Sequence, residues 1–177
     1  MYLLGLYLGD GTITLHRRQV YRLWIYCDSK YQAIIDQAVV TMRMVLPRTV
    51  GLVEKQGEVG VNSYSQHWPC LLPQHGPGRK HERKIELASW QQQLVIRHPK
   101  LLLRGLIHSD GCRDLNPVNG KDYPRYQFSN RSADVRGIFT DTCDLLGVRW
   151  RQSDAWTISI ARRPDVAFLD TFIGPKA

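Results

Sequence analysis

An internal repeat is the feature that most constrains this chain of 177 residues. Residues 3–11 read LLGLYLGDG, and residues 103–111 read LRGLIHSDG. In register, the two stretches share leucines, a glycine, a small residue and a terminal Asp-Gly pair. An internal repeat outweighs single local signals, because each copy marks one structural unit. The sequence therefore predicts two related halves, with Asp10 and Asp110 at equivalent places.

Each copy predicts an apolar helix that is stopped in the left-handed conformation by the glycine after its aspartate. Gly5 and Gly9 are four residues apart, and so are Gly105 and Ser109. Small residues at this spacing form a flat strip on one helix face, where two backbones can approach closely. If the two strips pack together, the two aspartates emerge side by side at the helix ends.

Two carboxylates at the negative ends of two helix dipoles repel one another. A divalent cation would neutralise them, and oxygen ligands of this kind suit magnesium or calcium. The alternative interpretation is two core helices that happen to end in Asp-Gly turns. The repetition of the aspartate beside matching small-residue strips favours a metal-binding pair.

The hydrophobic pattern predicts two strands, a helix and two more strands after each motif. In the first half we expect strands within residues 12–28 around a turn at 16–19, a helix over 31–45 capped by Asp28 or Ser29, and strands at 50–54 and 58–64. In the second half we expect a long loop at 116–120, a strand near 125–129, a helix from Ser132 to 146, and strands at 148–152 and 156–161. This order predicts an α+β fold with an antiparallel sheet in each half.

The two motifs resemble the signature of the LAGLIDADG homing endonucleases, in the single-chain form with two motifs. The resemblance covers essentially the whole chain and implies two pseudo-symmetric αββαββ halves. Each half would have a saddle-shaped sheet that lies in the major groove of DNA, and the motif helices would join the halves. The first half would span residues 1–78, a basic linker and lead-in residues 79–100, and the second half residues 101–177. The first motif begins almost at Met1, so either the natural protein extends further upstream or the first helix is unusually short.

The resemblance also implies an activity, namely a site-specific double-strand break made by metal-dependent hydrolysis of DNA. Asp10 and Asp110 would hold the metal, with Gly9 and Ser109 beside them. The expected cofactor is Mg²⁺ or Mn²⁺, with Ca²⁺ as a non-catalytic substitute. Gln127 matches a place where some family members hold a polar group over the attacking water.

A basic, loop-like segment separates the halves and contains the sequence Gly-Pro-Gly-Arg-Lys at 76–80, which Gly-Pro-Lys at 174–176 echoes. The family has a basic residue at about this place, which stabilises the phosphorane charge or orders the water. The resemblance thus implies catalytic roles for Lys80 and Lys176, with Lys84 as a substitute for Lys80. The alternative is a solvated loop or a patch that contacts phosphates.

Polar strand faces in both halves carry side chains that are suited to base edges, because Arg and Gln pair in bidentate fashion with guanine and adenine. The alternative is an ordinary solvated sheet face. The predicted DNA-binding residues are Arg17, Arg18, Arg22, Trp24, Tyr26, Arg79, Arg125, Gln127, Ser129, Arg149 and Arg151.

The net charge of +8 fits a polyanionic partner. We expect double-stranded DNA with a long, partly pseudo-palindromic target. No apolar run of membrane length and no signal-peptide pattern is visible, so we expect a soluble, intracellular (cytoplasmic) monomer with no membrane partner. The four cysteines lack paired spacing and predict reduced thiols.

Three rival interpretations remain open. The first is a DNA-binding transcriptional regulator that kept the scaffold and lost cleavage, and the second is an RNA maturase that uses the same basic surface. The third concerns a zinc site built from His67, Cys70, His75 and His81, although their spacing matches no familiar finger. Retention of both aspartates favours the nuclease.

Overall fold

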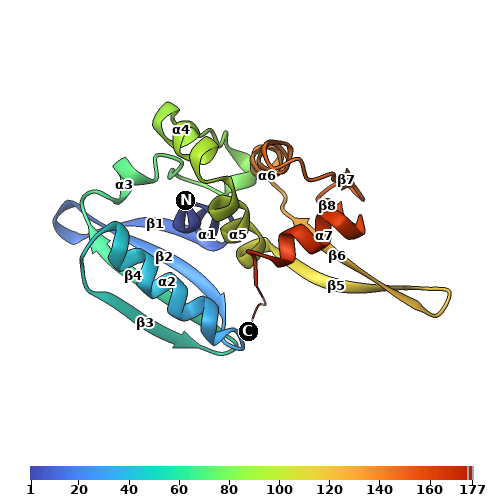
Figure 1. Ribbon diagram of the computed structural model, residues 1–177. Helices are drawn as coiled ribbons and strands as arrows, with labels where there is room; N and C mark the ends of the chain where they lie inside the picture. The colour runs from blue at the N-terminus through green and yellow to red at the C-terminus, as the bar shows by residue number, and fades with distance from the viewer. Residues whose placement is uncertain (175, 177) are drawn as a thin grey trace.

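Two four-stranded antiparallel sheets lie on either side of a central pair of helices, α1 (Tyr2–Asp10) and α5 (Pro99–Asp110), as Figure 1 shows. This computed structural model describes residues 1–174 and residue 176. The strand orders β1-β2-β4-β3 and β5-β6-β8-β7 are the same in the two halves. The predicted α+β fold with two related αββαββ halves is therefore confirmed.

The element bounds repeat in the same order in each half. The first half continues with β1 (Gly11–His16), a 3₁₀ turn (Arg17–Gln19), β2 (Val20–Asp28), α2 (Gln32–Val45), β3 (Val50–Lys55), β4 (Glu58–Ser65) and α3 (Trp68–Leu71). A connection with a 3₁₀ turn (Lys80–Glu82) and α4 (Ser89–Arg97) leads to α5. The second half continues with β5 (Gly111–Val118), β6 (Lys121–Ser129), α6 (Ala133–Leu145), β7 (Arg151–Gln152), β8 (Thr157–Ile160) and α7 (Arg163–Asp170).

Helices cover the apolar face of each sheet, α1 and α2 in the first half and α5, α6 and α7 in the second. In β2, Leu23 and Ile25 are fully buried, while the residues between them face the other side. In β6 the same alternation buries Phe128, whose ring stacks on that of Phe139 of α6 with the centroids 4.3 Å apart. Because successive strand residues point to opposite faces, the polar alternates are left on the uncovered face of each sheet.

The motif helices pack through their small residues, as the sequence predicts. A Cβ atom on Gly5 would lie 2.7 Å from the Cα atom of Gly105, and a Cβ atom on Gly105 would lie 3.0 Å from the Cα atom of Gly5. These distances leave no room for a side chain between the two backbones. The close contact of α1 and α5 places their C-terminal ends, and hence the two halves, in a fixed relation.

The glycines after the two aspartates do not adopt the left-handed conformation that the sequence predicted. Gly11 has φ −95° and Gly111 has φ −107°, and both are extended. A Cβ atom on Gly11 would lie 2.5 Å from the Cα atom of Tyr7, and one on Gly111 would lie 2.8 Å from the Cα atom of Ile107. Glycine is required here because the chain turns from helix directly into strand against the last helical turn, and not because φ is positive.

The long loop expected at 116–120 was also wrong, because β5 continues to Val118 and pairs with β6. The turn itself is Asn119-Gly120 with φ values of 51° and 74°, the pattern of a tight hairpin turn. The strand expected at 148–152 is reduced to Arg151–Gln152, since the amide of Val148 still bonds to the carbonyl of Cys143 at the end of α6.

The helix after β2 begins later than predicted and lacks the predicted cap. Tyr31 precedes α2 without a side-chain cap, and Asp28 instead accepts a hydrogen bond from the amide of Lys30 at 3.0 Å. Ser132 does cap α6, because its hydroxyl accepts from the amide of Val135. The short helices α3, α4 and α7 were not predicted. No helix among the described residues has the length and apolarity to cross a bilayer.

Candidate active site

The two aspartates lie at the ends of the paired motif helices, where both line one cleft together with Lys80 and Asn130. A Cβ atom on Gly9 would lie 2.8 Å from Oδ2 of Asp110. The second carboxylate therefore lies against the last turn of the first helix. The repeat thus brings together one acidic group from each half.

Both carboxyl groups hold their protons more tightly than an ordinary aspartate. Loss of hydration in the cleft, and then the negative charge of Asp110, raise the pKa of Asp10 to about 6, although its side chain keeps contact with solvent. Loss of hydration also raises the pKa of Asp110, against the hydrogen bond from Asn130 and the nearby lysines. The pair carries a charge that the protein itself only partly compensates.

Lys80 lies at the C-terminal end of α1. Its Nζ atom donates hydrogen bonds to the carbonyls of Tyr7, Leu8 at 3.0 Å and Gly9 at 2.7 Å. The amide of Gly11 makes the last helical bond, to the carbonyl of Tyr7. The carbonyls of Leu8 and Gly9 lie beyond that bond at the negative end of the helix, so a cation is favoured there. Burial lowers the pKa of Lys80 to about 8, while the two aspartates act in the opposite direction. The ammonium group thus lies beside the acidic pair and loses its proton at a lower pH than an exposed lysine does.

Lys176 takes the matching place in the second half. Its Nζ atom donates a hydrogen bond of 3.1 Å to the carbonyl of Ser109, near the end of α5. Burial lowers the pKa of Lys176 as well, and both aspartates oppose this effect. Lys84, the predicted substitute for Lys80, is exposed and pairs with Glu86 at 2.6 Å. One lysine from the linker and one from the tail therefore contact the two helix ends.

Asn130 is a site residue that the sequence analysis missed. Its Nδ2 atom donates to Oδ2 of Asp110 at 2.6 Å, and its Oδ1 atom accepts from the amide of Ser132 at 2.7 Å. The second bond fixes the orientation of the amide, so that the donor side faces the carboxylate. Gly11 pairs with Ile25, and Gly111 pairs with Phe128; in this register Cys27 is the counterpart of Asn130. The two carboxylates therefore have different surroundings.

The donor set of this centre suits a hard divalent cation. It offers two carboxylates with raised pKa values, and the carbonyls of Gly9 and Ser109 lie at the adjoining helix ends. Across the described residues no group of three or more His, Cys, Asp or Glu side chains could hold a metal ion. Magnesium keeps several waters and often binds through one or two carboxylates together with substrate phosphates. The residues present thus fit such an ion completed by a phosphate-bearing ligand.

The same observation bears on the zinc alternative. His67, Cys70, His75 and His81 all belong to the described residues, and they form no group able to hold a metal ion. The four cysteines are free; Cys27 and Cys143 are buried.

The uncovered face of the first sheet is dominated by stacked aromatic rings. The guanidinium of Arg22 lies 3.6 Å from the centroid of the Trp24 ring, which in turn stacks parallel to Tyr26. Arg22 also donates from Nε to Oδ1 of Asn62 at 3.0 Å. Arg22 is thus held within its own sheet.

The second sheet presents a more polar face. Gln127 lies opposite Cys112 and Ser159, and Arg151 pairs with Ser159 on the next strands, so all of them share this face. Within the described part of the chain, Nε of Arg125 is buried without a hydrogen-bond partner. Ser129 is engaged with Thr157 at 2.7 Å.

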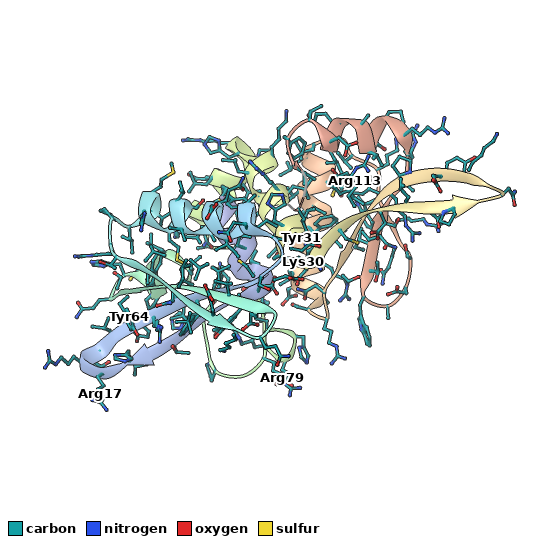
Figure 2. The ribbon with its side chains drawn as sticks, turned by 90° about the horizontal axis from the view of Figure 1, so that it is seen from below. Arg17, Lys30, Tyr31, Tyr64, Arg79 and Arg113 are labelled. Carbon is teal, nitrogen blue, oxygen red and sulfur yellow. The ribbon has the colours of Figure 1, made fainter. Side chains whose placement is uncertain are left out.

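Three predicted DNA-binding residues lie in loops and one lies outside the sheet. Figure 2 shows Arg17 at the tip of the β1–β2 hairpin and Arg79 on the connection between the halves. Arg18 lies next to Arg17 in the same exposed turn, with φ of 60°. Arg149 precedes β7 and is exposed, so the structure does not bring it onto the sheet face.

Comparison with protein-family models and with curated proteins found no match. Solved structures do match over nearly the full length. The homing endonuclease I-DmoI in complex with DNA and Mn aligns with a TM-score of 0.66 at 16% identity, over 98% of this chain and 94% of that chain. The meganuclease I-AabMI bound to uncleaved DNA aligns with a TM-score of 0.59 at 11% identity, over 97% and 81%.

The N-terminal LAGLIDADG domain of WhiA also aligns, with a TM-score of 0.58 at 13% identity, over 98% of this chain and 80% of that chain. I-DmoI was also solved in complex with DNA and Ca, and a variant with its target DNA in the presence of Mg. The protein therefore has the fold of the LAGLIDADG homing endonucleases, which the WhiA domain shares.

Proposed function

We propose that this protein is a divalent-metal-dependent DNA endonuclease that hydrolyses one phosphodiester bond in each strand of a duplex. The observation that carries the proposal is the pair Asp10 and Asp110, which one cleft brings together at the ends of two closely packed helices. Such a pair is costly unless a cation compensates it. One lysine from the linker and one from the C-terminal tail also reach the same centre.

Asp10 and Asp110 would hold Mg²⁺ or Mn²⁺, beside the backbone of Gly9 and Ser109. When bound, the metal would lower the pKa of a water molecule and neutralise charge on the leaving 3′-oxygen. In the overall reaction the water oxygen forms a bond to phosphorus, and the bond between phosphorus and the 3′-oxygen breaks. The leaving oxygen ends as a hydroxyl group.

The lysines supply positive charge where negative charge develops on the phosphate. Lys80 and Lys176 are already ordered at the two helix ends, so little reorganisation is needed when the phosphate gains charge. Gln127 on β6 would order water in the second half, where the first half has Trp24. The chemistry at the two strands is therefore expected to differ.

The proposed partner is duplex DNA with a long, partly pseudo-palindromic site. The uncovered sheet faces belong to two halves with the same strand order, which supports recognition of two related half-sites. Paired strands fit the major groove, and Arg and Gln read base edges there. Arg17, Arg18 and Arg79 are exposed on loops and suit phosphate contacts.

The test is a cleavage selection with the protein on a randomised duplex library, in Mg²⁺ or Mn²⁺, followed by sequencing of the cut ends. We expect a defined site cut on both strands. Asp10→Asn and Asp110→Asn proteins are the matched controls, and each should bind the selected site in Ca²⁺ without cutting it in Mg²⁺. Binding of a specific duplex by the wild-type protein without cleavage in either metal would contradict the proposal and indicate DNA binding alone.

A further inference from the structure

His108 joins three separate segments of the chain beside the proposed active centre. It lies two residues before Asp110, it is 5% exposed, and its counterpart in the first motif is the buried Leu8. The hydroxyl of Tyr2 at the start of α1 lies 2.8 Å from Nδ1 of His108. Nε2 lies 2.9 Å from the carbonyl of Ile173, which follows α7.

The partners of the ring define how its hydrogen is placed. A carbonyl oxygen can only accept, so Nε2 carries the hydrogen and donates to Ile173. In the neutral ring Nδ1 is then left as an acceptor for the hydroxyl of Tyr2. Both ring nitrogens of His108 are therefore satisfied inside the protein, and the ring acts as a bridge from the motif helix to the C-terminal tail.

Lys176 depends on this tail for its position. Ile173 is 1% exposed, and its amide bonds to the carbonyl of Leu169. Lys176 follows three residues later, within about 10 Å of extended chain. Among the described residues its ammonium group donates one hydrogen bond, to the carbonyl of Ser109, whereas Lys80 donates three to α1. The location of Lys176 therefore depends more on how the tail is anchored.

We propose that His108 is a positioning residue, which anchors the tail at Ile173 and so delivers Lys176 to the end of α5. This inference rests on the proposed function, because it concerns the lysine of the second half. The linker that carries Lys80 is anchored in another way, through a 2.7 Å bond from the amide of Ile85 to Asp134. Loss of His108 should therefore affect one half of the centre and spare the other.

A double-mutant cycle on the selected duplex tests this role, with separate rate constants for the two strands. We expect Lys176→Met to slow one strand, and His108→Leu to slow the same strand by about 10- to 100-fold, as for a misplaced catalytic group. The double variant should be no slower than Lys176→Met alone, because His108 acts through Lys176. His108→Gln, which keeps a donor for Ile173, should restore most of the rate.

Equal slowing of both strands by His108→Leu, or losses that multiply in the double variant, would overturn the inference. So would a Lys176→Met protein that cuts both strands at the wild-type rate. Hydrogen exchange of the segment 168–174 gives a readout that needs no cleavage, and we expect it to accelerate at least about tenfold in His108→Leu as the tail opens locally. Unchanged exchange would refute the anchor even if the protein proves to cut no DNA, in which case the proposed function fails separately.

Discussion

Asn130 donates a hydrogen bond of 2.6 Å to the carboxylate of Asp110. The matching position in the first half is Cys27, and no hydrogen bond from it to Asp10 is present among the described residues. One carboxylate of the pair is thus oriented by an amide, and the other is not. The two aspartates of the pseudo-symmetric scaffold therefore have chemically different surroundings.

The hydrogen bond from Asn130 to Asp110 should determine the acid limb of the pH–rate profile. Because the hydrogen bond from Asn130 lowers the pKa of Asp110, Asn130→Ala should raise that pKa, and the ionised form should be reached only at higher pH. We expect the rate of one strand to begin to rise at higher pH than in the wild type, with the other strand unchanged. Strand-resolved cleavage from pH 5 to pH 9 measures this, and coincident profiles would contradict the assigned role.

Asp10→Asn should stabilise the protein in the absence of metal. The pKa of Asp10 is raised to about 6 from an ordinary value of 3.8, so the folded state binds its proton more tightly than the unfolded state does. Stability from this group is therefore lost as the pH rises from about 4 to about 6. The melting temperature of the variant should equal that of the wild type near pH 4 and exceed it above pH 7.

Two controls accompany this measurement. Asp122→Asn, on the exposed β5–β6 hairpin, should leave the melting temperature unchanged across the same range. Addition of Mg²⁺ should raise the melting temperature of the wild type and not that of Asp10→Asn, because a ligand stabilises only a state that binds it. A variant no more stable than the wild type at pH 8 would mean that the acidic pair is not strained.

The glycine contact between the motif helices should be intolerant of a single methyl group. A Cβ atom on Gly105 would lie 3.0 Å from the Cα atom of Gly5, whereas one on Gly137 of α6 meets nothing within 4 Å. We expect Gly105→Ala to lose about 1–3 kcal/mol of unfolding free energy by overpacking. Gly137→Ala should keep or gain up to about 1 kcal/mol, since alanine is the better helix former. Urea titrations of both variants decide this, and equal midpoints would place the helix contact elsewhere.

Lys80 should be needed for cleavage and less so for binding. Lys80→Met removes the charge that bonds to the Tyr7, Leu8 and Gly9 carbonyls, so the stabilisation of charge on the phosphate is lost. We expect about 100-fold slower cleavage of at least one strand, with duplex affinity in Ca²⁺ changed little. Lys84→Met is the matched control, because Lys84 is exposed and pairs with Glu86. Equal effects of the two variants would assign the linker a general electrostatic role.

The sequence predicted the acidic pair and both lysines because each signal is carried by a repeat. Asp10 and Asp110 end matching motifs, and Lys80 and Lys176 follow matching Gly-Pro sequences. Asn130 could not be found in this way, because its counterpart is Cys27. Its role depends on the turn after β6, in which the backbone amide of Ser132 orients the side-chain amide of Asn130. The conformation of this turn is visible in the structure and not in the sequence pattern.

The sequence predicted the fold correctly where hydrophobic alternation is strong. It failed at single turns, where the backbone conformation depends on one or two residues. The alternation in β2 placed Leu23 and Ile25 in the core correctly. The Asn119-Gly120 turn was interpreted as part of a loop, although Asn-Gly between alternating residues is a strong hairpin signal. The left-handed conformation predicted for Gly11 was wrong. Glycine is required there because the backbone lies close to Tyr7, and such an approach excludes a side chain as strictly as a positive φ does.

Base discrimination should depend more on the second sheet than on the first. Arg22 is held by Asn62 and the Trp24 ring, so part of its hydrogen-bonding capacity is used within the protein. Gln127 and Arg125 face the uncovered side of the second sheet. Nε of Arg125 is buried, so only the outer nitrogens of its guanidinium group can reach a base edge.

Arg125→Ala or Gln127→Ala should therefore lose about 1–3 kcal/mol of discrimination at particular base pairs, as expected for a bidentate contact. Arg17→Ala and Arg79→Ala should weaken binding to all sequences alike and reduce the salt dependence by about one phosphate contact each. Affinities for every single-base variant of the selected duplex, at two salt concentrations, separate these effects. A uniform loss from all four substitutions would rule out base reading by the second sheet, because only contacts to base edges depend on which base pair is present.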